Sequence, residues 1–185
     1  MVREVNVVSY NPDWPDQFQV EADLITDSLG ENVNSVHHMG STAIPGMIAK
    51  PTIDILLVVK SHDVLDANQQ ALGALGYLPK GENGIPGRRY YVRLEGEFHR
   101  CHVHAFEEGH PEVERHLLFR DYLRSHPDEA QAYGSLKLKL VEQFPRDPQS
   151  YTEAKSEFIR EIDQRAAAWQ HSLSGEESDE WKSLD

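Results

Sequence analysis

The chain has 185 residues, enough for one domain with a substantial core. Hydrophobic residues make up 39% and charged residues 26%, which is ordinary for a soluble globular protein. The 31 acidic residues outnumber the 18 Lys and Arg, and the formal charge of −13 argues against a nucleic-acid partner. The lone Cys101 excludes an intramolecular disulfide, the first residues lack an apolar signal core, and no apolar run is long enough for a membrane helix. We therefore expect a cytoplasmic protein with no membrane partner.

The first half of the chain mixes helix and strand patterns. Residues 12–29 carry apolar side chains at spacings of three and four and predict a helix that a glycine ends. Residues 35–39 predict a short strand, and residues 52–59, almost all β-branched or apolar, predict a central strand. Residues 63–75 predict a second helix.

The second half begins with two predicted strands, 88–94 and 98–106, joined by a tight turn at Gly96. Three helix-like segments follow, each beginning near a proline, where a missing N–H costs little: 111–125, 127–143 and 148–170. These elements predict a mixed α/β (α+β) fold with about three helices at its C-terminal end.

The end of the chain has a different composition. Residues 172–185 are mostly polar and acidic and include an isolated Trp181, and we expect them to be disordered. The predicted organisation is therefore a single domain over residues 1–171 followed by an acidic tail.

Chemistry is concentrated between the first two predicted strands. Gly40, Ser41 and Thr42 follow a strand, where small side chains and exposed N–H groups suit a phosphate; they also suit an ordinary loop and helix cap. Asp54 is a carboxylate in an apolar strand, and a buried carboxylate needs hydrogen bonds, an opposite charge or a metal. A structural hydrogen bond at the start of the strand is the alternative role for Asp54.

The run from His38 to Val59 resembles the hallmark of the GrpB family, whose domain is also fused to some dephospho-CoA kinases. Further similar motifs occur in the expected order at 10–14, 118–127, 133–137 and 151–155. The resemblance implies the nucleotidyltransferase superfamily: a mixed β-sheet with flanking helices, a Gly-Ser motif, and acids on neighbouring strands that hold two divalent ions. It implies a nucleoside triphosphate as ligand and Mg²⁺ or Mn²⁺ as cofactor.

The sequence departs from that pattern at the second acid. Asp54 matches the first acid, but residue 56, on the same face of the strand, is Leu. The strand where a third acid is expected offers His102 and His104 on one face. Together with Asp54 and His38 these histidines could hold Zn²⁺ or Mn²⁺; otherwise they form hydrogen bonds or contact substrate. Asp54 and His104 are the predicted catalytic residues.

Several basic residues are candidates for phosphate binding. Lys50 precedes the Asp54 strand, and of Arg88 and Arg89, which alternate in direction, we favour Arg89 as facing a cleft. Further candidates, each with an ordinary structural or solvent-exposed role as the alternative, are Arg120, Lys137 and Lys155.

Three functions remain open on this basis. The first is transfer of a nucleotidyl group from a nucleoside triphosphate to an unknown small acceptor. The second is binding of a nucleotide or phosphometabolite without transfer, which the missing acid at residue 56 favours. The third is a metal-dependent enzyme of another class that uses Asp54 with His102 and His104.

Overall fold

The computed structural model describes residues 4–180, and side chains up to residue 173. Five strands form one mixed sheet in the order β1-β2-β5-β4-β3. β2 and β5 are parallel, and the other neighbours are antiparallel. The strands are β1 (Val33–Met39), β2 (Ile53–Val59), β3 (Tyr77–Pro79), β4 (Arg89–Glu95) and β5 (Phe98–Glu107).

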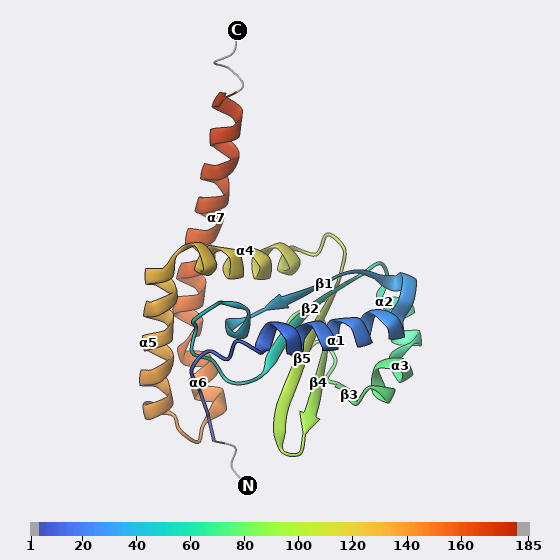
Figure 1. Cartoon of the computed structure of the whole chain (residues 1–185). Helices are drawn as coiled ribbons and strands as arrows, with labels where there is room; N and C mark the ends of the chain where they lie inside the picture. Colours follow the sequence, from blue (N-terminus) through green and yellow to red (C-terminus); the bar gives the residue numbers. More distant parts are fainter. Residues whose placement is uncertain (1–3, 181–185) are drawn as a thin grey trace.

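Helices cover both faces of the sheet and extend beyond one end of it (Figure 1). The α-helices are α1 (Trp14–Leu29), α2 (His62–Ala67), α3 (Gln69–Ala74), α4 (Pro111–Ser125), α5 (Pro127–Gln143), α6 (Pro148–Ala154) and α7 (Ser156–Glu180). Short 3-10 helices, η1 (Gly30–Asn32) and η2 (Ser41–Ala43), flank β1. The mixed α/β fold predicted from the sequence is confirmed.

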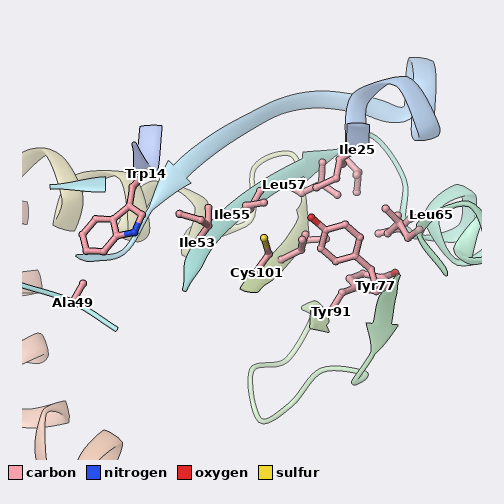
Figure 2. Packing of buried hydrophobic residues seen from close by; sticks show 14 residues of the cluster. Trp14, Ile25, Ala49, Ile53, Ile55, Leu57, Leu65, Tyr77, Tyr91 and Cys101 are labelled. Atoms are coloured by element: carbon pink, nitrogen blue, oxygen red, sulfur yellow. The ribbon is translucent and has the colours of Figure 1, made fainter. Parts of the chain in front are cut away.

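One face of the sheet packs against α1, α2 and α3. Completely buried side chains of β2, such as Ile55, meet Ile25 of α1 and Leu65 of α2 in this core (Figure 2). Cys101 of β5 also points into it, on the opposite face from His102, because side chains alternate along a strand. Burial raises the pKa of the Cys101 thiol to about 12, so this cysteine is a packing residue and not a nucleophile.

The opposite face is apolar at one end and polar at the other. Met39, Leu56, Val58 and Phe106 form a buried cluster against α4. Asp54 and His102 lie on the same face, because their strand positions alternate with the residues of the first core. This polar end of the face is where the candidate site lies.

The C-terminal helices form a second core that holds the loop between η2 and β2. Ile44 and Met47 of this loop are buried with Tyr133 of α5 and Ile162 of α7. Val5, near the start of the chain, packs against α5 and α6. The loop that follows the Gly-Ser motif is thereby fixed against α5, α6 and α7, which lie together at one end of the sheet (Figure 1).

Two helices that the sequence predicted to be continuous are each interrupted in the structure. The helix expected over residues 63–75 is split at Asn68, whose side chain donates a hydrogen bond to the Val64 carbonyl (2.8 Å) and whose backbone leaves the helical region. The helix expected over residues 148–170 is split at Lys155. The remaining predicted strands and helices are confirmed within a few residues, and β3 was not predicted.

The last helix extends past the predicted end of the domain. α7 continues through Ser172 to Glu180, where the sequence predicted a disordered tail. The end of that tail, including Trp181, lies outside the described residues. Over the part of the chain that the structure describes, no helix is long and apolar enough to cross a membrane.

Candidate functional site

The Gly-Ser motif lies directly against Asp54. Gly40, at the end of β1, has a φ of 70°, in the left-handed region that favours glycine. A Cβ atom at this position would lie 2.6 Å from Oδ2 of Asp54, which is a steric clash. Gly40 is therefore required both by its backbone conformation and by the close approach of the loop to the carboxylate. Ser41 follows as the first residue of η2.

Asp54 belongs to a chain of hydrogen bonds along the sheet face. Nδ1 of His102, the neighbour of Asp54 in the parallel β2–β5 register, lies 3.1 Å from Oδ1 of Asp54. Because a carboxylate only accepts, this nitrogen of His102 is the donor. Nε2 of His102 lies 2.7 Å from Nδ1 of His99. Both ring nitrogens of His102 are therefore engaged, and its ring orientation is fixed.

The Asp54 carboxyl is ionised at neutral pH. Burial alone would raise its pKa, but the hydrogen bond from His102 and the positive charges of nearby groups, including Lys155, lower it below the usual value. The side chain retains 29% of its surface exposed, so the carboxylate is accessible from solvent. Asp54 therefore presents a fixed negative charge beside the Gly-Ser loop.

Three lysines form a cluster near this loop. Lys137 of α5 is 2% exposed, and its ammonium donates to Oγ of Ser41 (3.0 Å) and to the Ile48 carbonyl. Lys155, at the break between α6 and α7, and Lys50 each place Nζ over the Tyr151 ring, at 4.6 and 4.7 Å from its centroid. We call Lys50, Lys137 and Lys155 the lysine cluster; it comes from three separate segments of the chain.

The pKa values of two of these lysines are depressed. Burial, reinforced by the charge of Lys155, lowers the pKa of Lys137 to about 7. Burial and then the charge of Lys50 lower the pKa of Lys155 to about 8, against the opposing effect of Asp54. Among the described residues, neither Lys137 nor Lys155 forms an ion pair with a carboxylate. Positive charges are thus held together near the Gly-Ser loop, and the Asp54 carboxylate offsets their repulsion at Lys155 only in part.

Two tyrosines form the wall of the lysine cluster, and the sequence did not identify either as a site residue. The Tyr133 hydroxyl hydrogen-bonds Ser41, and its ring lies 4.6 Å from Nζ of Lys137. Tyr151 is 1% exposed and contacts the other two ammonium groups. A tyrosine face attracts a cation through its quadrupole, so these rings hold the ammonium groups without cancelling their charge.

His104 lies further along the same face of the sheet and is uncharged. Burial lowers its pKa to about 3. Nη1 of Arg88 donates to its Nδ1 (3.2 Å), which leaves the ring proton on Nε2. Tyr90 packs edge-on against both His102 and His104, at 5.5 and 5.0 Å between ring centroids. His104 is thus neutral, with its remaining ring N–H at Nε2.

Arg89 and His38 do not lie where the sequence predicted. Arg89 forms a bidentate pair with Asp66 of α2, on the far face of the sheet; the arginine on the site face is Arg88, which is 4% exposed. His38 pairs with Ile55 in the β1–β2 register, which places it on the opposite face from Asp54. Its Nε2 lies 2.9 Å from Oγ1 of Thr42, and its ring stacks on Phe18. The predicted grouping of His38 with Asp54 is therefore wrong.

Thr42 and Arg120 occupy structural positions. Thr42 is 1% exposed, and its hydroxyl hydrogen-bonds His38 and the Thr52 carbonyl, so the side chain has a structural role. Arg120 of α4 donates to the His38 carbonyl (3.0 Å) and pairs with Asp121. It attaches α4 to β1, which is the structural alternative weighed for this residue.

The donor set at Asp54 does not fit a two-metal centre. The second acid of such a centre is replaced by Leu56, which is completely buried among apolar side chains. Within the described ranges, no group of three or more His, Cys, Asp or Glu side chains is placed to hold a metal ion. The two divalent ions that the family resemblance implies would require hard oxygen ligands, and one carboxylate supplies too few.

The fold and the Gly-Ser-Asp arrangement define a nucleotidyltransferase-like α/β domain. A cytoplasmic RNA terminal U-transferase structure aligns with 73% of this chain and 41% of its own, at a TM-score of 0.51 and 11% identity, which shows likeness of fold alone. The sequence profile of the GrpB protein family matches residues 4–165, and the chain belongs to that family. The crystal structure of conserved protein GrpB from Enterococcus faecalis is 38% identical, with a TM-score of 0.83 over 87% of this chain and 96% of that one.

Relatives of known sequence agree with this assignment. UPF0157 protein YqkA of Bacillus subtilis is 42% identical over 90% of this chain, and glutamate-rich protein GrpB of Alkalihalophilus pseudofirmus is 36% identical over 86%. A dephospho-CoA kinase of Mycobacterium bovis is 28% identical over 88% of this chain. The chain spans 94% of the Alkalihalophilus protein but only 48% of YqkA and 46% of the kinase. The family predicted from the sequence is confirmed.

Proposed function

We propose that the chain binds the phosphate groups of a nucleoside triphosphate, or of a related phosphometabolite, between the Gly-Ser loop and the lysine cluster. The observation that carries this proposal is the position of the Lys137 ammonium, 3.0 Å from Oγ of Ser41, with Lys155 beside it. Holding like charges together in a partly buried place is unfavourable in the free protein. A bound polyanion removes that repulsion, and its oxygens accept the ammonium protons.

The reaction supported best is nucleotidyl transfer to a hydroxyl of a small acceptor. The acceptor oxygen attacks the α-phosphorus, the bond from that phosphorus to the bridging oxygen breaks, and pyrophosphate leaves. The proton of the acceptor passes to the Asp54–His102 pair, whose members are hydrogen-bonded at 3.1 Å. The lysine cluster stabilises the charge on the leaving pyrophosphate. His104, uncharged, is available to donate a hydrogen bond to a bound group.

The second candidate is binding without transfer. It is favoured by one observation, the replacement of the second acid by Leu56, which leaves Asp54 as the single acid of the motif. The two candidate functions share the proposed phosphate site. They differ in whether the bound triphosphate is turned over with the help of Asp54.

The proposal is tested by thermal melting of the metal-stripped protein against a panel of nucleoside triphosphates, each with and without Mg²⁺ and Mn²⁺. A ligand at about 100 times its dissociation constant stabilises the fold by about 2.7 kcal/mol. We expect such a shift with at least one triphosphate, its loss in Lys155→Met, and its retention in Lys139→Met, which removes an exposed lysine of α5. The absence of a shift with every triphosphate in the wild-type protein would overturn the proposal.

Turnover separates the two candidates. Pyrophosphate release is measured with the triphosphate that binds and with a set of small hydroxyl acceptors. If transfer occurs, Asp54→Asn retains the melting shift and loses the release. A melting shift without release under any acceptor favours the binding module.

A further inference from the structure

The site has the opposite charge from a metal-dependent nucleotidyl centre. A centre that holds two divalent ions is built from several carboxylates and is strongly anionic before the ions bind. Here the carboxylate at the Gly-Ser loop is Asp54, and the position two residues further along the strand is the buried Leu56. The Lys137 ammonium contacts Ser41 of this loop, and the charge of Lys155 acts on both Lys137 and Asp54. With Lys137 and Lys155 protonated, their two positive charges outweigh that of Asp54, so the free site attracts an anion and repels a dication.

The charge of Asp54 is already compensated within the protein. Its Oδ1 accepts the hydrogen bond from His102, and the positive charge of Lys155 acts on the same carboxyl. The remaining nitrogen of His102 is hydrogen-bonded to His99. A metal ion could reach Oδ2 of Asp54 without displacing the His102 hydrogen bond, but it would lie in the field of the Lys155 ammonium. That repulsion opposes binding of a metal.

The lysines are placed where they can replace the charge that metal ions would supply. Lys137 is fixed by Ser41 and the Ile48 carbonyl, and Lys155 by the Tyr151 ring, so neither has to be ordered when a ligand arrives. We infer that the lysine cluster supplies the positive charge that divalent ions would otherwise supply, and that the site binds a metal-free di- or triphosphate group. This inference rests on the proposed phosphate pocket and specifies the ionic form of its ligand.

The inference is tested by isothermal titration with inorganic tripolyphosphate, once in EDTA and once in excess Mg²⁺. Because Mg²⁺ neutralises part of the charge of the anion, the affinity in EDTA is expected to equal or exceed that in Mg²⁺. Lys155→Met should weaken binding in EDTA at least tenfold, and Lys139→Met should leave it unchanged. Binding in Mg²⁺ with none in EDTA would overturn the inference while leaving the phosphate pocket intact. No binding in either condition would overturn the pocket and the inference together.

A second variant tests the role of Asp54 directly. If Asp54 holds no metal, its negative charge repels the ligand, so Asp54→Asn should tighten binding of tripolyphosphate in EDTA by roughly two- to tenfold. If Asp54 holds an essential metal, the same variant should lose affinity, and that loss in Mg²⁺ would contradict the inference. The melting temperature of Asp54→Asn is measured alongside, and the wild-type titrations decide the question even if this variant does not fold.

Discussion

Replacement of Lys137 by Met gives a direct measure of the burial of charge in the candidate site. The side chain is 2% exposed, its ammonium lies over the Tyr133 ring at 4.6 Å, and burial lowers its pKa to about 7 from an ordinary value of 10.5. Methionine keeps the length of the aliphatic chain and removes the titrating group. The difference in stability between wild type and variant must therefore depend on pH in a calculable way.

The direction of the pH dependence of wild-type stability follows from the number of protons that the folded and unfolded states bind. Between pH 7 and pH 10.5 the unfolded chain keeps the Lys137 proton that the folded protein has lost, so the wild-type stability rises with pH. From pH 6 to pH 9 the rise from this one group is about 3 kcal/mol, and it is absent in Lys137→Met. At pH 9 the variant should be the less stable of the two. There it lacks the hydrogen bonds to Ser41 and the Ile48 carbonyl, worth roughly 1–3 kcal/mol.

The assay is urea denaturation of the two proteins at several pH values between 6 and 9, with Lys139→Met as the matched control for loss of an exposed lysine on the same helix. The free energy of unfolding of Lys137→Met, relative to wild type, should fall by about 3 kcal/mol as the pH rises. The control should follow the wild-type curve. A difference between Lys137→Met and wild type that is independent of pH would refute the reasoning, since it would mean that Lys137 keeps an ordinary pKa in the folded protein.

Three further predictions follow from the same geometry. Gly40→Ala should destabilise the protein by about 2–4 kcal/mol in urea denaturation, because it combines a positive φ with a clash against Asp54; Gly30→Ala, with positive φ and open space, should cost less, and equal costs would contradict the clash. Arg88→Met should raise the pKa of His104, measured by NMR titration, because it removes a positive charge beside the ring; an unchanged pKa would argue against the contact. Tripolyphosphate affinity, measured by titration calorimetry, should fall from pH 7 to pH 9 as Lys137 and Lys155 lose their protons, and a rising affinity would exclude these amines as ligands.

Local sequence patterns were sufficient for most of the fold. Residues 12–29 and the three proline-initiated segments carry helical spacing, and residues 52–59 are too uniformly apolar for anything but a central strand. The two breaks, at Asn68 and at Lys155, were missed because apolar periodicity continues across them. The short strand β3 has three residues, too few to show a period.

The candidate site was likewise predicted only in part from the sequence. Gly40, Ser41 and Asp54 were predicted, because a Gly-Ser loop and an acid on the next strand are close in sequence. The errors at Arg89 and His38 arose from the direction of alternating side chains, which a shift of one residue reverses. Tyr133 and Tyr151, which hold the lysine cluster, begin the family-like motifs at 133–137 and 151–155, but their contacts with the lysines depend on the tertiary fold and were not predicted.

A crystal structure of the protein with tripolyphosphate in EDTA tests the central claim most directly. The account predicts an anion in the pocket, with its oxygens within hydrogen-bonding distance of Ser41 and the ammonium groups of Lys137 and Lys155. An anion bound elsewhere on the chain, with this pocket unchanged at a ligand concentration that saturates the protein, would contradict it.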